Sequence, residues 1–419
     1  MRVVHLLRKY NPDEWGGTET ALLRLLEGLR PRGVDPIIYY PATNNHFSRD
    51  PLLAAGYSLK PFHACVPYWG MPESQRQQLI AVGGNLMSFD LFAKLRREEH
   101  VDLIHTHALG RLGGIASSYA RNRGIPSVVS IHGGVLDLPE AVRNGFANPQ
   151  TKGLEWGKIF GLLFRSRRVL AEADAIITVN PREAALLHEK YPDRRIQIQP
   201  HGVPLIQYKP DHRSAAFDAF PELRDKQILL SLGRIDPIKN QNWLLQQAPQ
   251  TFAKHPDARL VFVGACTDAP YGKGIERTID ELDLRNRVLL TGGLPPDDPR
   301  LLGLLQAATL VLLPSISETF GLVLLEAWAA RTSVLSSRTS GASALIQHRT
   351  NGWLFDLDQP HTFHEALDEA LTRPEFRQQL AEAGHKLVST EYDTNVLAGR
   401  IKKLYDELIE EKHALRRAA

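Results

Sequence analysis

Cysteine is nearly absent from this chain of 419 residues, which has only Cys65 and Cys266, far apart in the sequence. Two isolated thiols form neither a disulfide framework nor a metal-ligand spacing, and they favour a reducing compartment. Long apolar runs are missing too. No segment approaches the roughly 18 uninterrupted apolar residues of a membrane-spanning helix, and the run after Met1 is too short for a signal peptide.

The sequence also lacks a charge bias. It has 50 Lys and Arg against 47 Asp and Glu, a net charge of +3 with neutral histidines. This balance gives no general case for nucleic-acid binding. With 43% hydrophobic residues, the composition is that of a soluble globular protein long enough for two cores. We therefore expect a cytoplasmic enzyme, with peripheral contact at the inner face of a membrane kept as an alternative.

Short apolar runs alternate with helical patterns along the chain, and the pattern breaks and restarts near residue 205. Such alternation predicts parallel sheets with crossover helices. We predict two doubly wound Rossmann-like α/β domains, residues 1–205 and 206–392, and then a C-terminal helix within 393–419. The predicted strands are 3–7, 36–40, 101–105, 127–131, 175–179, 228–232, 259–263, 287–291 and 309–314. Residues 136–157 show no clear period, which indicates a long loop.

Two glutamates, Glu318 and Glu326, follow the predicted strand 309–314 and are separated by seven residues. Glu326 lies in a predicted helix, 322–330, where its neighbours three and four positions away are all apolar. A carboxylate in such surroundings needs a polar partner. Glu318 lies in the turn before the helix, where the first helical amides point at the mouth of the sheet.

Further polar residues follow other predicted strands of the second domain, where ligands of open α/β sheets bind. Arg234 and Lys239 enclose a turn that contains Pro237, and one forked and one compact cation suit a diphosphate. Taken alone, either cation is more typical of a solvent-exposed loop that binds no ligand. Gly264 follows the next strand and allows close approach of the backbone to a ligand, although a plain turn has the same requirement.

The first domain has its own candidates. Gly16 and Gly17 open its first predicted helix and can bring a phosphate or sugar near backbone amides, without the spacing of a dinucleotide fingerprint. His132 follows the strand 127–131 and can donate a hydrogen bond to a sugar hydroxyl. His105 and His107 flank Thr106, but no carboxylate or cysteine nearby in the sequence completes a metal site.

In combination these segments resemble the retaining glycosyltransferases of family 4, which have the GT-B fold. The matching pieces are Gly16-Gly17-Thr-Glu19, Ile131-His132-Gly133, Gly233-Arg234 through Lys239-Asn240, and the motif E-x7-E from Glu318 to Glu326. The resemblance runs from about residue 1 to about residue 390. Family members often have Asn-Gly-Val-Asp at the domain junction, where this chain has His201-Gly-Val-Pro204.

The resemblance implies two domains that face a central cleft, with the terminal helix crossing back to the first domain. It also implies a nucleotide-diphosphate sugar as co-substrate, with no cofactor and no obligatory metal ion. Arg234 and Lys239 would neutralise the diphosphate, Glu326 would bind the ribose, and Glu318 and His132 would hold the transferred sugar. Gly17 would lie near the diphosphate or the acceptor. The amides that would cradle phosphate and sugar are those of Thr319, Phe320, Gly321 and Leu322.

The favoured function is therefore hexosyl transfer, with retention, from a nucleotide sugar to a saccharide or small-molecule acceptor. A UDP-sugar is the favoured donor. An alternative is transfer from GDP-mannose or a UDP-sugar to a lipid-linked acceptor at a membrane surface. Residues 156–170 hold apolar side chains beside clustered arginines, as lipid-bound segments do, but a core-facing helix with a wet basic end is the commoner arrangement. A nucleotide-sugar-binding module without catalysis is the alternative from another class.

Overall fold

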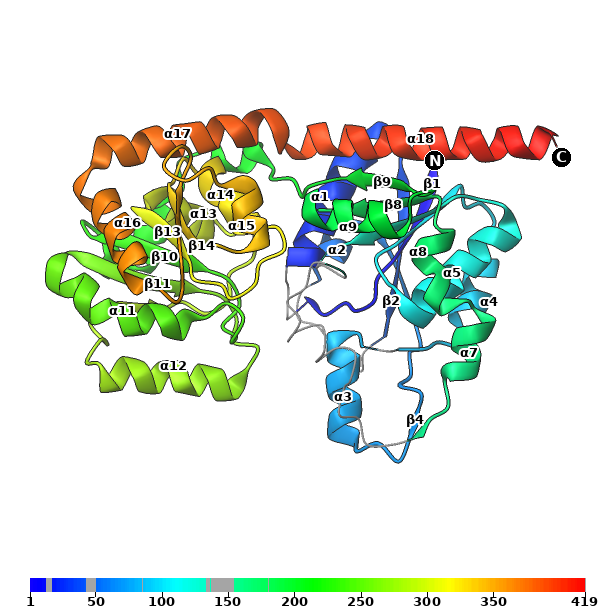
Figure 1. Ribbon diagram of the computed structural model, residues 1–419, viewed down its shortest axis with the longest axis horizontal. Helices are drawn as coiled ribbons and strands as arrows, with labels where there is room; N and C mark the ends of the chain where they lie inside the picture. Colours follow the sequence, from blue (N-terminus) through cyan, green and yellow to red (C-terminus); the bar gives the residue numbers. More distant parts are fainter. Residues whose placement is uncertain are drawn as a thin grey trace. The chain divides into compact units, whose positions relative to one another are not determined.

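The computed structural model describes residues 1–12, 17–42, 50–84, 86–132, 136, 154–179 and 181–418. The chain divides into two compact units. Met1–Pro200 and Ala398–Ala419 form unit 1, and His201–Leu397 form unit 2. Each unit is built on a parallel sheet with helices packed around it (Figure 1).

Unit 1 contains a seven-stranded parallel sheet in the order β3-β2-β1-β5-β6-β8-β9. A short antiparallel pair, β4 (Tyr68–Trp69) with β7 (Leu154–Glu155), lies outside this sheet. The seven strands are β1 (Arg2–Leu6), β2 (Asp35–Pro41), β3 (Ser58–Phe62), β5 (Leu103–Thr106), β6 (Ser127–Ile131), β8 (Ala175–Thr178) and β9 (Arg195–Ile198).

Unit 2 contains a six-stranded parallel sheet in the order β12-β11-β10-β13-β14-β15. Its strands are β10 (Gln227–Leu232), β11 (Ala258–Val263), β12 (Val288–Leu290), β13 (Leu310–Leu313), β14 (Val334–Ser337) and β15 (Trp353–Phe355). Both sheets grow outward in two directions from their first strand. The strand order therefore reverses between β1 and β5 and between β10 and β13, which is where a doubly wound sheet opens a crevice for ligands.

Most of the helices connect successive strands as crossovers, whereas α16 and α17 follow the last strand, β15. In unit 1 they are α1 (Gly17–Leu29), α2 (Pro51–Ala54), α3 (Glu73–Val82), α4 (Leu91–Arg96), α5 (Gly110–Arg123), α7 (Lys158–Leu163), α8 (Val169–Glu172) and α9 (Pro181–Lys190). In unit 2 they are α10 (Arg213–Ala219), α11 (Gln241–Lys254), α12 (Ala269–Glu281), α13 (Pro299–Ala307), α14 (Leu322–Ala329), α15 (Ser340–Leu345), α16 (Pro360–Thr372) and α17 (Pro374–Glu391). Short 3₁₀ turns include η3 (Ser166–Arg168) and η4 (Leu205–Tyr208).

The last helix, α18 (Thr394–Ala418), belongs mostly to unit 1. Its apolar residues recur at helical spacing and are buried with strands of the unit 1 sheet, as in the cluster that joins Ile401 and Tyr405 to Val3 and Val128. The carboxyl-terminal segment thus returns to the first sheet after the second unit is complete. The predicted class of two doubly wound α/β domains with a returning helix is confirmed.

The sequence prediction was wrong for residues 156–170. This segment is not one core-facing helix, because α7 and η3 contain no buried residue and only α8 turns Val169 and Leu170 inward. The exposed fractions of Ile159, Leu162 and Leu163 are 76%, 82% and 68%. Of the predicted loop at 136–157, most lies outside the described residues, and Leu154–Glu155 is the strand β7.

Candidate active site

The loops after β10 and β13 meet at the point where the strand order of unit 2 reverses. The amide of Ile316 donates to the carbonyl of Ile238 over 2.8 Å, and the side-chain amide of Asn240 donates to the carbonyl of Pro314 over 3.2 Å. These two bonds tie the turn with Arg234 and Lys239 to the turn that precedes α14. The parallel sheet therefore brings the two predicted segments into one surface, although more than 70 residues separate them in the sequence.

Asp236 organises the first of these turns. It is buried, and its carboxylate accepts hydrogen bonds from the amides of Ile238 and Lys239, both at 3.0 Å. It also forms an ion pair with Arg234 at 3.0 Å. Sequence reasoning missed Asp236, although an aspartate that begins a turn and bonds amides two and three residues later is a recognised pattern. Its charge holds the Arg234 guanidinium beside the turn.

Lys239 and Glu318 form an ion pair with each other. The side chains are only 22% and 19% exposed, so the two charges are shielded from most of the solvent. The carbonyl oxygen of Glu318 accepts hydrogen bonds from the amide of Gly341 at 2.8 Å and from the Ser340 hydroxyl at 3.3 Å. The sequence prediction placed these two residues on different parts of the donor, and the structure adds that they are direct partners.

The turn from Glu318 to Gly321 leads into α14. Gly321 has φ +90°, a left-handed conformation that favours glycine, and α14 begins at the next residue, Leu322. The Phe320 ring is buried and packs edge-on against His201, with 5.2 Å between ring centroids. Thr319 and Leu322 are half-buried. A ligand would therefore meet the backbone of Phe320, because the side chain belongs to the packing of unit 2.

Glu326 lies on the buried helix α14, and its residue is 9% exposed. Its neighbours Leu325 and Ala327 are completely buried. The observed burial agrees with the apolar spacing noted in the sequence. The ribose-binding role of Glu326 stays a prediction.

Gly264 stands where the turns after β10 and β11 touch. A Cβ atom at this position would lie 2.0 Å from the carbonyl oxygen of Gly233, so the neighbouring turn already requires a glycine. The contact with Gly233 is therefore enough to explain why residue 264 is a glycine, and a role of Gly264 in ligand binding stays a prediction. Gly17 is the first residue of α1, and Gly16 lies outside the described residues.

Four histidines of unit 1 form a row at the carboxyl ends of its central strands, in which His5, His105 and His107 are buried and His132 is half-buried. His132 and His107 are joined by a ring-nitrogen contact of 2.6 Å, and His107 and His5 by one of 3.1 Å. His105 contacts the Ser130 hydroxyl at 2.6 Å and the Tyr405 hydroxyl at 2.5 Å. Two neutral imidazoles make such contacts when one donates and the other accepts.

Burial lowers the pKa of three of these imidazoles and so keeps them neutral. It lowers the pKa of His5 to about 3 and that of His132 to about 4, and it lowers the pKa of His105 well below its ordinary value. At neutral pH, His132 therefore acts as a hydrogen-bonding group without a charge. The first domain can thus offer a neutral ring to a sugar hydroxyl.

His5, which the sequence prediction did not include, completes a cluster with His105 and His107. One nitrogen of each ring lies within 4.8 Å of the others. The parallel register of β1 and β5 sets His5 directly opposite His105. Sequence spacing alone paired only His105 and His107. The structure shows the rings engaged in hydrogen bonds with one another, with Ser130 and with Tyr405.

An aspartate-any-aspartate triplet, Asp356-Leu357-Asp358, stands apart from the predicted site. It follows β15, the edge strand of the unit 2 sheet. Asp356 forms an ion pair with Arg338 at 3.3 Å. Among the described residues, the cluster of His5, His105 and His107 is the one group with the spacing of metal ligands, and the aspartate triplet belongs to no such group.

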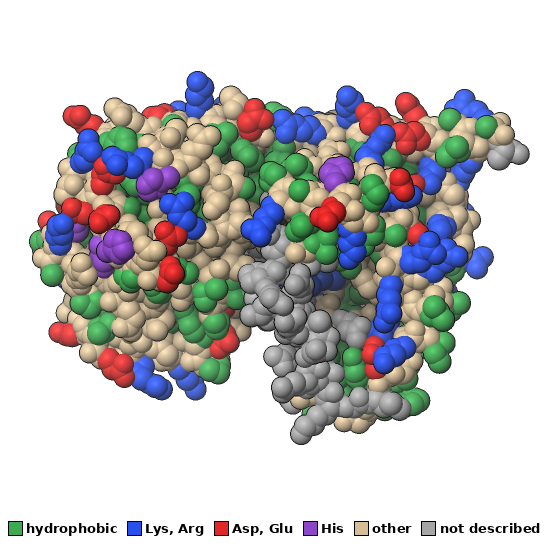
Figure 2. Space-filling model, viewed as in Figure 1, with side chains coloured by type: hydrophobic (Ala, Val, Ile, Leu, Met, Phe, Trp, Pro, Cys, Tyr) green, Lys and Arg blue, Asp and Glu red, His purple; other side chains and the backbone are tan. Residues whose placement is uncertain are grey.

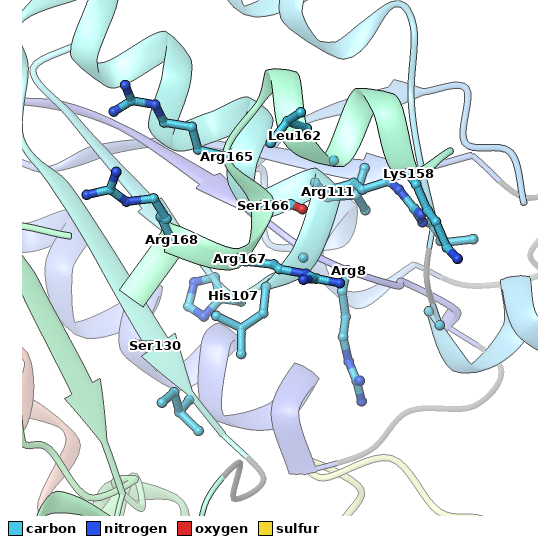
Figure 3. A pocket seen from close by; sticks show the side chains of 18 of the residues that line it. Arg8, His107, Arg111, Ser130, Lys158, Leu162, Arg165, Ser166, Arg167 and Arg168 are labelled. Atoms are coloured by element: carbon cyan, nitrogen blue, oxygen red, sulfur yellow. The ribbon is translucent and has the colours of Figure 1, made fainter. Parts of the chain in front are cut away.

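A cavity of about 960 Å³ opens in unit 1 beside the histidine row. His107 and Arg8, which follows β1, line it (Figure 3). His132 and Thr18 of α1 are also among its lining residues. The opposite wall comes from α7 and η3. The cavity thus occupies the crevice at the carboxyl ends of β1, β5 and β6, as the reversal of strand order requires.

Comparison with known proteins matches both units. Residues 15–207 match the family model described as Glycosyltransferase Family 4, and residues 213–387 match Glycosyl transferases group 1. D-inositol 3-phosphate glycosyltransferase from Nocardia farcinica is 30% identical, over 81% of this chain and 73% of that protein.

The chain belongs to the group 1 glycosyltransferases. The group 1 match contains Arg234, Lys239, Glu318 and Glu326, and the family 4 match contains Gly17 and His132.

Solved structures of low identity confirm the GT-B fold of this glycosyltransferase. Sucrose-phosphate synthase from Thermosynechococcus elongatus matches with a TM-score of 0.74 at 21% identity, over 98% of this chain and 100% of that one. Anabaena Alr3699/HepE, crystallised with UDP, matches with a TM-score of 0.71 at 18% identity, over 97% of this chain and 100% of that one. Among the described residues of the glycosyltransferase, no helix is both long and apolar enough to cross a bilayer.

Proposed function

We propose that this glycosyltransferase moves a hexose from a UDP-sugar to a saccharide or small-molecule acceptor, with retention of the anomeric configuration and without an obligatory metal ion. The observation that carries the proposal is that the turn with Arg234 and Lys239 meets the turn before α14 at the switch point of unit 2, where Lys239 pairs with Glu318. A site with two cations beside the start of a helix is suited to bind a nucleotide diphosphate.

In the proposed reaction, the bond between the sugar C1 and the diphosphate breaks, and negative charge develops on the departing phosphate. Lys239 and Arg234 stabilise that charge, and preorganised charges of this kind often supply the largest catalytic term. The ion pair with Glu318 holds the Lys239 ammonium in place before the donor arrives. The acceptor hydroxyl attacks from the face that the phosphate leaves, and the phosphate takes the proton, so no protein nucleophile is required.

Glu318 and Glu326 accordingly have different roles from the acid and nucleophile of a glycoside hydrolase. Glu326, buried on α14, accepts hydrogen bonds from the ribose hydroxyls. Glu318, in the turn before α14, accepts from hydroxyls of the transferred sugar. His132 donates to the same sugar as a neutral ring, because burial lowers its pKa to about 4.

Uridine is the proposed base, with support from the UDP held by the structurally similar Anabaena protein. The test is a thermal-shift series of the full chain with UDP, GDP, ADP and their sugars. UDP and UDP-hexoses should raise the melting temperature most, since ligands that bind only the native state stabilise it in proportion to ln(1 + [L]/Kd). A larger shift with GDP or ADP would replace uridine as the base, and no shift with any nucleotide would contradict the donor site.

A lipid-linked acceptor is a second candidate, favoured by the exposed apolar side chains of α7. Ile159, Leu162 and Leu163 project into solvent next to a ring cluster in which Phe89 packs on Trp156, and Phe89 itself is 64% exposed. Arg165, Arg167 and Arg168 follow directly in the sequence. On the face seen in Figure 2, Lys and Arg side chains stand beside hydrophobic ones in this region. Such a surface complements an anionic membrane leaflet.

Flotation with vesicles tests this second candidate. The wild-type chain should float with vesicles that contain anionic lipid and remain behind with neutral ones, and the paired change Leu162→Ser with Leu163→Ser should abolish flotation. Leu415→Ser is the matched control, because Leu415 is 67% exposed on α18, away from α7 in the sequence. Equal recovery of the α7 variant with the anionic vesicles would remove the membrane reading.

A further inference from the structure

The cavity in unit 1 has an excess of positive charge. The described residues that line it include one carboxylate, Glu155, and six cationic side chains: Arg8, Arg111, Lys158, Arg165, Arg167 and Arg168. Like charges that share a concave surface repel one another, and low-dielectric walls strengthen the field inside.

Half of these cations already have carboxylate partners. Arg111 pairs with Glu155, and Arg165 and Arg168 both pair with Glu172 at 3.0 Å. Figure 3 shows the Arg165 and Arg168 guanidinium groups extending together, away from Arg8 and Arg167.

The other three cations, Arg8, Lys158 and Arg167, form no ion pair within 4.0 Å in the described part of the chain, although the charge of Glu19 acts on Arg8. Exposed lysines and arginines are common on any surface, and one alone would carry no argument. Here three come from two distant segments, the end of β1 and the stretch from α7 to η3, and they line the same cavity as the neutral His132. Because Arg165 and Arg168 share the one carboxylate of Glu172 and Glu19 offsets only part of the charge near Arg8, the cavity keeps an excess of positive charge for a ligand to neutralise.

We propose that this cavity binds a phosphate group carried by the acceptor. The proposal rests on the proposed hexosyl transfer and names the chemical class of the acceptor. Two guanidinium forks and one ammonium suit a phosphate monoester or diester, since arginine bonds phosphate oxygens in pairs and lysine adds a compact charge. Because His132 is neutral, it contributes a hydrogen bond to the bound sugar without competing for the phosphate.

Two sources supply the same chemistry: a small phosphorylated sugar or polyol, and the phosphate of a lipid-linked sugar. The cation set is common to both. The exposed apolar residues of α7 would contribute only to the second. Binding to a soluble phosphate monoester and binding to anionic vesicles therefore separate the two sources.

The experiment titrates the full chain, with UDP present at saturation so that the donor site is occupied. Its soluble ligands are inorganic phosphate, glucose 6-phosphate and glucose. The vesicles are phosphatidylcholine alone and phosphatidylcholine with phosphatidic acid. The variants are Arg8→Ala, Lys158→Ala and Arg167→Ala, together with Arg167→Lys, which keeps the charge and removes the fork. Arg96→Ala is the control, since Arg96 is exposed on α4 and does not line the cavity.

The wild-type chain and Arg96→Ala should bind a phosphate-bearing probe and not glucose. Each alanine variant should bind that probe at least tenfold more weakly than the wild type. Arg167→Lys should have an affinity between those of the wild type and Arg167→Ala, and UDP binding should stay unchanged in all variants. Response to glucose 6-phosphate or inorganic phosphate would identify a soluble acceptor, and response only to phosphatidic acid vesicles would identify a lipid-linked one. Equal binding by the wild type and the variants, or no response to any phosphate-bearing probe, would overturn the proposal. Failure of UDP to bind the wild type would instead contradict the donor site, and the phosphate titrations are then read without UDP.

Discussion

Replacing Lys239 with methionine should lower kcat/KM for hexosyl transfer by at least about 100-fold, the size of effect seen when a preorganised donor to a developing negative charge is removed. The loss has two parts. The ammonium no longer stabilises the leaving diphosphate, and Glu318 remains as an unneutralised charge at the same site. Steady-state kinetics with a UDP-hexose donor, together with UDP titration, would measure both.

A double variant separates catalysis from simple ion pairing. Lys239→Met with Glu318→Gln removes the isolated carboxylate and should recover much of the UDP affinity, while turnover stays low. Lys273→Ala is the matched control, because Lys273 is an exposed lysine on α12 of the same unit. Full recovery of turnover in the double variant would mean that Lys239 serves only to neutralise Glu318, and the catalytic assignment would be wrong.

Gly341→Ala should disable the donor site without altering any proposed ligand-binding side chain. A Cβ atom on Gly341 would lie 2.5 Å from the Phe320 amide nitrogen and 2.7 Å from the Glu318 carbonyl oxygen. Both neighbours are backbone atoms, so the turn before α14 must shift. We expect UDP affinity to fall at least tenfold and the free energy of unfolding to fall by about 1–3 kcal/mol, the usual cost of overpacking.

The matched control for that change is Gly274→Ala. Gly274 lies within α12 of unit 2, and a Cβ atom there would have no heavy atom within 4 Å outside its own helix backbone. Its replacement should leave UDP binding unchanged and leave stability equal or up to about 1 kcal/mol higher. Titration of UDP and urea unfolding of both variants provide the comparison. If Gly341→Ala bound UDP as well as Gly274→Ala, the turn from Glu318 to Phe320 would not be part of the donor site.

The sequence predicted the elements whose patterns are local and strong. The central strands are short buried runs that are followed by polar residues. The predicted strands 127–131 and 228–232 therefore agree with β6 and β10 to within one residue. The edge strand β3, Ser58-Leu-Lys-Pro-Phe62, was missed because it is polar at alternate positions and contains a proline. The C-terminal helix, α18, was predicted because its apolar residues recur at helical spacing over several turns.

Site features that depend on contacts between distant segments were not predictable in the same way. His5 became part of the histidine row only through the register of β1 with β5, and the Lys239–Glu318 pair joins loops 79 residues apart. The exposure of α7 was predicted wrongly because the sequence of an amphipathic segment does not indicate which of its faces packs against the rest of the protein. In each case the missing information was the three-dimensional neighbour, while the residue types were already visible.

The anomeric configuration of the product is the most direct test of retaining hexosyl transfer from a UDP-sugar. The full chain is incubated with UDP-hexose labelled with ¹³C at C1 and with the acceptor that the cavity experiment identifies, in the presence of a chelator, and the product is followed by NMR. We expect the wild-type product to have the same configuration at C1 as the donor, and we expect no transfer by the Lys239→Met variant. An inverted product, a requirement for a divalent ion, or tight nucleotide binding without transfer to any acceptor would contradict it.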